Sequence, residues 1–174
     1  MPENNLIIDS RDTFGGWFED FCQGQVFKHW PGKTITEMDN HLFSLLTMND
    51  NPLHTDAHYM DGHQHGKILV NGLLVMSLVV GMSVRQTSGK AIANLQYESI
   101  VHDAPVFIGD TIYGESKVLS VETSRKKPTQ GVVSIETKAY NQDSVTVLTM
   151  KRKFLVPKKT VSNKSDDKEL YGTS

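Results

Sequence analysis

The sequence contains one cysteine, Cys22, among 174 residues. A single thiol forms neither an intrachain disulfide nor a thiolate metal site. Disulfides are rare in the reducing cytoplasm, so the composition suits a cytoplasmic protein, and we expect that location. The N-terminal stretch carries Glu3, Asp9 and Asp12 and has no apolar core, so we expect no secretory signal peptide.

Long apolar runs and an excess of charge of one sign are also missing. The longest apolar stretch, residues 68–84, is interrupted by polar or small residues, namely Asn71, Gly72, Ser77, Gly81 and Ser83. A membrane-spanning helix needs roughly 20 predominantly apolar residues, so we interpret this stretch as a buried helix and expect no membrane partner. The formal net charge of -2 gives no reason to expect nucleic acid as a partner.

The length suits one globular domain, with 38% hydrophobic and 22% charged residues. Residues 158–174 are rich in Lys, Ser, Asp and Thr and offer almost nothing to bury, so we expect a disordered tail. Residues 1–13 have a similar composition and are expected to be flexible. The packed domain is therefore predicted to span residues 14–157.

The spacing of apolar residues predicts strands, two helices and then more strands. Short strands are expected at residues 25–29 and 33–36, on either side of a turn at Pro31 and Gly32. Alternating or β-branched residues predict further strands at residues 91–99, 111–123, 131–141 and 145–156, the last two as a hairpin. One antiparallel sheet wrapped around a long central helix fits this order, which is an α+β layout.

The two helices are expected at residues 37–48 and 69–85. Thr36 is a suitable N-cap for the first helix, whose buried face is predicted from apolar residues at helical spacing, namely Met38, Leu42, Leu45 and Leu46. The second helix is apolar nearly all round, which predicts burial on most sides. Residues 56–66 lie between them and are polar and histidine-rich, so we expect a short helical turn and a loop.

Polar residues crowd together directly after the first helix, in the run Asn49-Asp50-Asn51-Pro52-Leu53-His54-Thr55-Asp56. Such groups are costly to bury unless they bond to one another or to a ligand. A turn whose side chains cap local backbone groups would explain the composition. A proton-transfer site would explain it as well, because imidazole titrates near neutral pH.

The order of elements and two motifs resemble a known family. A long buried helix followed by an antiparallel sheet resembles the hotdog fold. The Asn-Pro-Leu-His-x-Asp run at residues 51–56 and the Pro-Val-x-x-Gly-Asp run at residues 105–110 resemble the MaoC-like dehydratases, the R-specific enoyl-CoA hydratases. Three further segments, at residues 46–54, 81–84 and 91–95, and Tyr140-Asn141-Gln142-Asp143 resemble the mesaconyl-CoA hydratase (β-methylmalyl-CoA dehydratase) branch.

The resemblance implies a lyase that reversibly hydrates a 2-enoyl-CoA, of which a short branched dicarboxylic acyl-CoA such as mesaconyl-CoA is one candidate. It implies that His54 is the catalytic base, that Asn49 or Asp50 completes a polar pair with it, and that the Gly72 backbone N–H stabilises an oxyanion. Substrate-binding positions follow from the same motifs, at Asn51, Pro52, Leu53, Asn71, Gly72 and Asn94. It implies no cofactor or metal, and a homodimer or a dimer of dimers.

Two positions depart from the family pattern. The usual motif is Asp-x-Asn-Pro-x-His, but this sequence has Asn49 in place of the aspartate, and a carboxamide cannot donate and recover a proton as a carboxyl group does. Either Asp50 or Asp56 supplies the carboxylate, or Asn49 orients water while His54 handles protons alone. Many relatives carry a serine where Val80 aligns, and Ser77 substitutes for it only if it faces the same cavity.

Two other functions fit a hotdog domain. A non-catalytic acyl-thioester binding module is favoured by Asn49 and Val80. A thioesterase needs an acid or base on the buried helix, and residues 69–85 include no Asp, Glu or His. The histidine-rich segment has no Cys or Glu at a familiar metal-ligand spacing, so we expect a solvated loop there.

Overall fold

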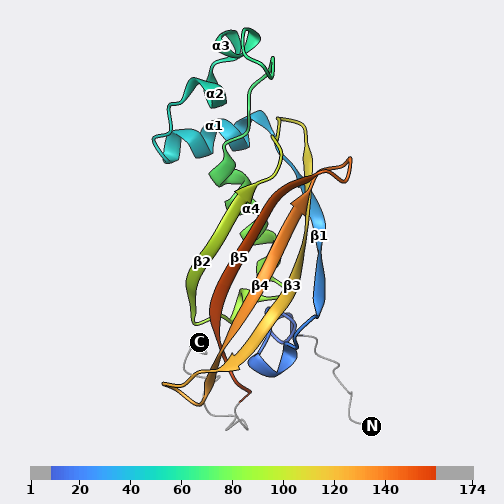
Figure 1. Ribbon diagram of the computed structural model, residues 1–174, viewed down its shortest axis with the longest axis vertical. Helices are drawn as coiled ribbons and strands as arrows, with labels where there is room; N and C mark the ends of the chain where they lie inside the picture. The colour runs from blue at the N-terminus through green and yellow to red at the C-terminus, as the bar shows by residue number, and fades with distance from the viewer. Residues whose placement is uncertain (1–8, 160–174) are drawn as a thin grey trace, which may run out of the picture.

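In the computed structural model, which describes residues 9–159, five antiparallel strands form one sheet in the order β1-β3-β4-β5-β2 (Figure 1). The strands are β1 (Val26–Thr34), β2 (Ala93–His102), β3 (Thr111–Thr123), β4 (Gln130–Tyr140) and β5 (Thr146–Pro157). These bounds confirm the last four predicted strands to within a few residues. Most of the predicted flexible ends, residues 1–8 and 160–174, lie outside the described residues.

The centre of the sheet is a meander of three long strands. β3 pairs with β4 from Tyr113↔Tyr140 to Thr123↔Gly131, and β4 pairs with β5 from Gln130↔Pro157 to Tyr140↔Thr146. β5 then pairs with β2 at the edge of the sheet. Inward-facing residues alternate along β3, β4 and β5, which is why their sequences read as strands with one buried face.

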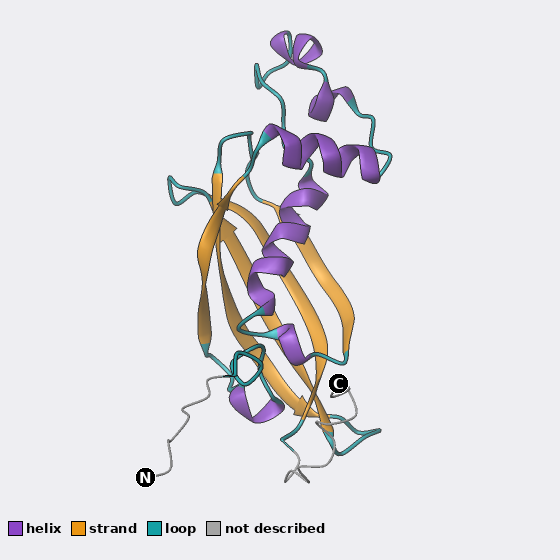
Figure 2. Ribbon diagram, turned by 180° about the vertical axis from the view of Figure 1, so that it is seen from behind, coloured by secondary structure: helices purple, strands orange, loops and turns teal. Residues whose placement is uncertain are grey.

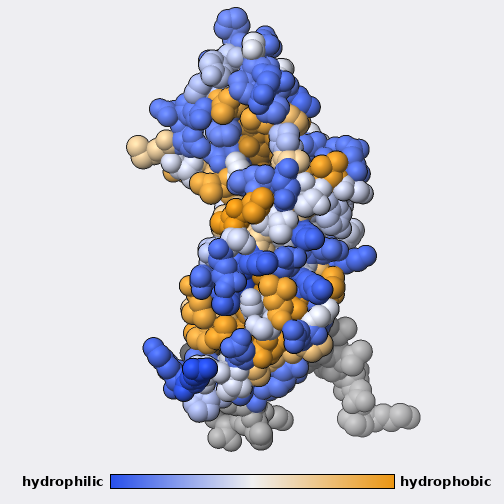
Figure 3. Space-filling view, viewed as in Figure 1, coloured by the Kyte–Doolittle hydropathy of each residue, from blue (hydrophilic) through white to orange (hydrophobic). Residues whose placement is uncertain are grey.

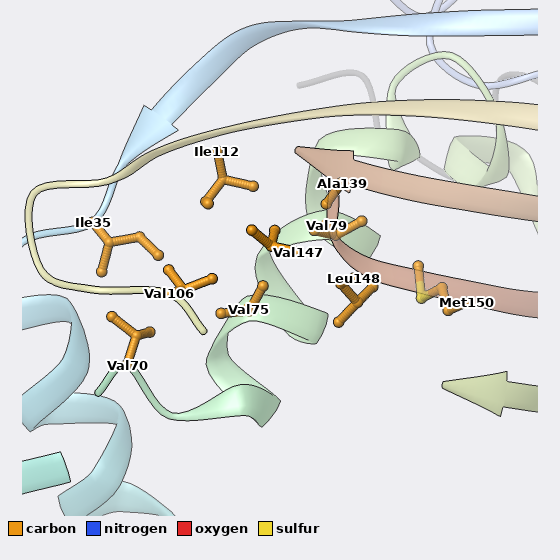
Figure 4. Packing of buried hydrophobic residues seen from close by; sticks show 10 residues of the cluster. All are labelled: Ile35, Val70, Val75, Val79, Val106, Ile112, Ala139, Val147, Leu148 and Met150. Atoms are coloured by element: carbon orange, nitrogen blue, oxygen red, sulfur yellow. The ribbon is translucent and has the colours of Figure 1, made fainter. Parts of the chain in front are cut away.

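The central helix α4 (Gly72–Val84) lies along one face of this sheet (Figure 2). Val75 and Val79 point from the helix towards Leu148 and Met150 of β5 (Figure 4). The remaining residues of this cluster are Ile35, Val70, Val106, Ile112, Ala139 and Val147. Full burial of one such aliphatic side chain contributes about 1.5–3 kcal/mol, so this cluster holds the helix on the sheet.

The prediction from composition that α4 is buried on most sides is wrong for the single chain. Only Val75, Val79 and Ser83 are buried, at a spacing of four residues. Leu73, Ser77 and Gly81 follow the same spacing on another face and are exposed. The sheet covers one side of the helix, so an all-round apolar composition does not translate into all-round burial here.

Helix α1 (Glu37–Leu46) begins where predicted but is shorter by two residues than the expected 37–48, and it buries the opposite face. Thr36 caps it, because its side chain accepts a hydrogen bond from the Asp39 N–H. The predicted buried face is wrong, since Met38 is 75% and Leu46 is 74% exposed, and Leu42 and Leu45 are exposed too. Asn40 and Ser44 are the buried residues of α1, because they form hydrogen bonds beneath it.

The predicted turn at Pro31 and Gly32 is also wrong, because both residues lie inside the single strand β1. Strand β3 pairs with β1 on both sides of this point, at His29↔Gly114 and at Lys33↔Ile112. The register shift between these pairs is a bulge, which accommodates a proline that has no amide hydrogen to offer the ladder. The chain therefore continues along β3 where its composition suggested a reversal.

A buried guanidinium joins the sheet to the end of α4. Arg152 of β5 is only 2% exposed, and its Nη2 donates to Ser83 Oγ at 2.8 Å, Ser88 Oγ at 3.1 Å and Thr87 Oγ1 at 3.4 Å. Within residues 9–159 its Nε has no hydrogen-bond partner and no carboxylate forms an ion pair with it. Burial lowers the pKa of Arg152. The hydroxyl groups therefore replace an acidic partner.

Candidate active site

The short helix α2 (Pro52–Thr55) presents His54. Asn51 is its N-cap and accepts a hydrogen bond from the Leu53 N–H at 3.1 Å, while Pro52 occupies the first helical turn. Proline at this position needs no amide partner and is already set for helical φ. The polar run therefore does form a capped turn, and this turn places the imidazole.

The ring of His54 is oriented by a backbone carbonyl. His54 Nδ1 lies 3.0 Å from Leu69 O, and the Leu69 N–H donates to Leu53 O at 3.0 Å. A carbonyl oxygen only accepts, so Nδ1 carries the hydrogen of this bond and Nε2 keeps its lone pair in the neutral ring. This is the tautomer that a general base needs.

The next residues of the chain attach this arrangement to the core. The Val70 N–H donates to Val106 O at 2.9 Å, and Leu69 forms an isolated bridge with Phe107. Segment 69–70 is therefore bonded to α2 on one side and to residues 106–107 on the other. The position of His54 is therefore fixed by segment 69–70, which is itself held by residues 106–107.

Asn40 of α1 connects the helix of the base to the start of α4. It is fully buried, its Nδ2 donates to His54 O at 2.8 Å, and its Oδ1 accepts from the Asn71 N–H at 2.8 Å. A buried carboxamide that satisfies a donor and an acceptor on two neighbouring segments sets their separation. Burial of polar rather than apolar residues by α1 thus has a positional role.

The N-terminus of α4 carries an unused backbone donor. Asn71 is the N-cap and accepts from the Leu73 N–H at 3.0 Å, whereas the Gly72 N–H donates to no acceptor within residues 9–159. Unpaired N–H groups at a helix N-terminus, together with the helix dipole, favour negative charge. Gly72 is thus suited to hold a developing oxyanion.

His54 and Gly72 line one pocket of about 270 Å³. Its walls come from α2, the start of α4 and the end of β2. The other lining residues are Leu69, Val70, Val75, His102, Asp103, Ala104, Pro105 and Val106. A pocket with apolar walls and a few convergent polar groups is the usual form of a small-molecule site. It brings a base with a free nitrogen together with an oxyanion donor.

His102 lies directly over Gly72. A Cβ atom at Gly72 would lie 2.8 Å from His102 Cε1 and 2.9 Å from His102 Nε2, closer than real contacts allow. Glycine therefore leaves room for an imidazole ring beside the free N–H. Neither ring nitrogen of His102 forms a hydrogen bond within the described part of the chain.

Neither Asn49 nor Asp50 is among the residues that line this pocket. Asn49 is partly buried at the end of α1, where its Oδ1 accepts from the Asn51 N–H at 3.3 Å, and Asp50 is exposed. Asp56 caps α3 (Ala57–Asp61) through the Tyr59 N–H. Asp103 is the carboxylate that lines the pocket, with Thr149 Oγ1 donating to its Oδ2 at 2.8 Å.

Other predicted positions are divided between the site and the rest of the fold. Asn51, Pro52 and Leu53 shape the turn before His54, and Asn71 joins Asn40. Asn94 lies near the opposite end of β2 from His102, about 27 Å along the strand at its usual rise. Ser77 is exposed and Val80 packs against the core, so Ser77 does not take the place of a serine at position 80.

Sequence reasoning missed Asn40, His102 and Asp103. Asn40 lies between apolar residues of α1, and the amphipathic pattern directed attention to the other face. His102 and Asp103 are a polar pair at the point where a strand ends before Pro105, and strand ends often carry functional side chains. That signal is weak without the knowledge that β2 ends beside α4.

The histidine-rich segment forms a set of ring contacts and no metal site. The rings of His63 and His65 lie 5.4 Å apart between centroids and are tilted by 32°, and His65 contacts Phe107 edge-on at 5.9 Å. Within residues 9–159, no three His, Cys, Asp or Glu side chains converge as metal ligands. In the same range, every helix is too short or too polar to cross a membrane.

Comparisons with known proteins agree with the fold and the motifs. A family model described as "MaoC like domain" matches residues 20–141. The chain is 33% identical to β-methylmalyl-CoA dehydratase of Chloroflexus aurantiacus over 152 residues, which cover 87% of this chain and 43% of that protein. It is 29% identical to mesaconyl-CoA hydratase of Cereibacter sphaeroides over 145 residues, which cover 83% of this chain and 42% of that protein.

A solved structure confirms the hotdog fold. RV0216 of Mycobacterium tuberculosis, described as having a double hotdog fold, superposes with a TM-score of 0.78 at 23% identity, covering 85% of this chain and 46% of that one. The chain spans less than half the length of these two curated relatives.

Proposed function

Because the chain belongs to the MaoC-like domain family, we propose that it is an acyl-thioester hydro-lyase that reversibly hydrates a 2-enoyl-CoA. The observation that supports this proposal most directly is the shared pocket. His54, whose Nε2 is free to accept a proton, and Gly72, whose N–H is free to donate, line the same cavity. The comparisons supply the reaction class, since relatives of this chain are named hydratases and dehydratases.

The pocket supports the first half of the reaction. His54 Nε2 takes a proton from water, and the water oxygen adds to the β-carbon of the unsaturated thioester. The π electrons move towards the thioester oxygen, where the Gly72 N–H stabilises the negative charge. Such a donor acts best when it is fixed before the reaction, and Asn71 fixes this one by capping the helix.

The acyl group in this proposal is short, branched and dicarboxylic, as in mesaconyl-CoA. The names of two relatives support it, although the chain covers only 43% and 42% of their lengths. A pocket of about 270 Å³ has the size for a short acyl group and the end of its pantetheine. A reducing cytoplasm as the location stays a prediction from the single cysteine.

The test is turnover of crotonyl-CoA and mesaconyl-CoA, followed as loss of absorbance from the conjugated thioester. We expect His54→Gln to lower kcat at least 100-fold, as loss of a general base typically does, while binding of unreactive butyryl-CoA is retained. Asn49→Asp and Asp50→Asn measure whether either residue completes the polar pair. Release of free thiol instead of hydration would identify a thioesterase.

One observation favours a second function, a non-catalytic acyl-thioester binding module. The position where the family carries its catalytic aspartate holds Asn49, which does not line the pocket in this chain. Tight binding of butyryl-CoA and mesaconyl-CoA by the wild type, with no turnover of any enoyl-CoA, would identify this function and exclude the lyase.

The proposal includes a homodimer formed through β2. All ten residues of this edge strand are exposed, and the exposed set includes Leu95, Tyr97, Ile100 and Val101. Apolar side chains gather on the lower left of the molecule in Figure 3, on the side where β2 lies in Figure 1. An exposed apolar edge strand is a template for pairing with another strand, and a second copy offers the same strand.

Full antiparallel overlap of two β2 strands would place residue i opposite residue 195 − i, as follows from the bounds 93 and 102. Asn94 of a second copy would then lie opposite Val101, next to His102. This arrangement would bring the predicted substrate-binding Asn94 to the pocket. Sedimentation should show a dimer, and Leu95→Lys with Val101→Lys should give monomers. A monomeric wild type would contradict the pairing.

A further inference from the structure

Adding water to an enoyl thioester needs a proton donor for the α-carbon as well as a base for water. His54 takes the proton from water in the proposed reaction. Asn49 holds a carboxamide, which cannot act as an acid, and neither it nor Asp50 lines the pocket. A second titratable group that lines the pocket would supply this proton.

The pocket provides two titratable side chains besides His54, namely His102 and Asp103. Asp103 is exposed and already accepts a hydrogen bond from Thr149 Oγ1, so it serves as an acceptor in this pocket. The His102 side chain forms no hydrogen bond within the described residues, so both its ring nitrogens are free. An imidazole is also the side chain that gains and loses a proton near neutral pH.

The position of His102 suits this task. Its Cε1 and Nε2 lie 2.8 and 2.9 Å from the point where a Cβ of Gly72 would be. An acyl thioester whose oxygen accepts from the Gly72 N–H has its α-carbon one bond from the carbonyl carbon. The imidazole of His102 and the α-carbon are thus brought to the same glycine, where the missing Cβ leaves room for the ring.

We propose that His102 is the general acid of this site and protonates the α-carbon, a task that the carboxamide of Asn49 cannot perform. This inference rests on the proposed hydratase function. His54 Nε2 takes a proton from water, the C–O bond forms at the β-carbon, and the π pair moves to the thioester oxygen as an enolate. When the enolate collapses, its electron pair forms the Cα–H bond with the proton of the His102 imidazolium.

The products of this sequence are the 3-hydroxyacyl thioester, a neutral His102 and a protonated His54. One water molecule has been added, and the proton on His54 returns to His102 through solvent. The reverse reaction uses the same groups in exchanged roles, with His102 as the base that removes the α-proton. No oxidant, reductant or metal ion is required.

The test compares His102→Gln with His58→Gln, the same change at an exposed histidine of α3 that does not line the pocket. We expect His102→Gln to lower kcat for crotonyl-CoA or mesaconyl-CoA at least 100-fold, with KM changed less than threefold and the melting temperature unchanged. His58→Gln should behave as the wild type. An acid must be protonated to act, so the fall of wild-type kcat on the alkaline side should disappear in His102→Gln.

A second variant separates chemistry from packing. Added imidazole should restore turnover to His102→Ala in proportion to its concentration, because alanine leaves space where the ring was. It should not restore turnover to His54→Gln, because the glutamine side chain still fills the position of the base. His102→Gln with kcat within threefold of the wild type would overturn the inference and leave the hydratase function standing. Loss of kcat with an unchanged alkaline limb would overturn it too. A wild type without turnover would remove the proposed function itself.

Discussion

Replacement of Gly72 by alanine isolates the contribution of open space at the start of α4. The added Cβ would lie 2.8 Å from His102 Cε1 and 2.9 Å from His102 Nε2, against about 3.4 Å or more in ordinary contacts. The His102 side chain is exposed and its ring end is able to turn away. The clash should therefore displace the imidazole rather than unfold the helix.

Gly72→Ala should change the stability of the protein little and its activity strongly. Alanine is a better helix former than glycine by up to about 1 kcal/mol, which offsets the cost of moving the ring. The melting temperature should stay within about 2 °C of the wild type, since 1 kcal/mol corresponds to roughly 2–4 °C at this chain length. Alanine keeps the backbone N–H, but its Cβ displaces the His102 ring. Loss of a positioned general acid typically costs 10²–10⁴ in rate, so kcat/KM should fall about 100-fold, or about 2.7 kcal/mol.

Gly81→Ala is the matched control, because nothing lies within 4 Å of a Cβ at this exposed position of the same helix. This variant should be more stable by about 0.5–1 kcal/mol and keep its turnover of crotonyl-CoA. The assays are thermal unfolding followed by circular dichroism and turnover of the same enoyl-CoA by all three proteins. Gly72→Ala with kcat/KM within threefold of the wild type would refute the assignment of this glycine to the site.

Three further outcomes are expected from residues outside the pocket. Arg152→Met should leave the free energy of unfolding in urea unchanged or raise it, because a buried charge without an acidic partner is removed with little loss of volume. Arg152→Ala should lower this free energy by about 2–5 kcal/mol, because it leaves a cavity. A large loss in Arg152→Met would contradict this expectation. Burial lowers the pKa of His29 in the folded protein, with Gln86 Oε1 beside its Nδ1. The unfolded chain then binds the proton first, so the free energy of unfolding should fall as pH drops below about 6.5, and it should fall less in His29→Gln. An equal loss of unfolding free energy between pH 7.5 and pH 5.5 in the wild type and His29→Gln, measured by urea unfolding, would contradict this. Thr36→Ala removes the cap of α1 and should lower the free energy of unfolding by about 1 kcal/mol, measured in the same assay; an unchanged value would contradict the role of this cap.

The strands of the meander were predictable from sequence because each presents a regular buried face, and the central helix was predictable because its apolar stretch is too long for a strand. β3 was expected at residues 111–123 and has those bounds. Buried and more exposed residues alternate along β3 because the sheet is covered on one side. The β-branched residues in this pattern predict the strand from sequence. The order of elements then left few arrangements other than a sheet around a helix.

Helix α1 shows where that reasoning fails. Its apolar residues lie at helical spacing, yet Asn40 and Ser44 are the residues that it buries. Hydrophobic periodicity identifies which residues share a face, but it does not say what lies beneath that face. Here the segments beneath α1 need hydrogen-bond partners, and the contacts Asn40–His54 and Asn40–Asn71 decide the orientation.

The candidate site was predictable in part for a similar reason. His54, Pro52 and Gly72 were identified because motif and local geometry coincide within a few residues. His102 reaches the pocket only because β2 is the edge strand and ends beside the start of α4, which depends on pairing between residues far apart in sequence. Whether Asn49 or Asp50 takes part in the reaction stays a prediction.

The backbone and the side chain of Leu69 have separate tasks, and this separation bears on how the substrate range of the site is able to change. The carbonyl of Leu69 orients His54, and every amino acid at position 69 would supply the same acceptor. The side chain lines the pocket and is not needed for that bond. Substitutions at position 69 other than proline would therefore reshape the proposed acyl cavity while His54 keeps its tautomer, so under the proposed function single changes would alter specificity without altering the proton chemistry.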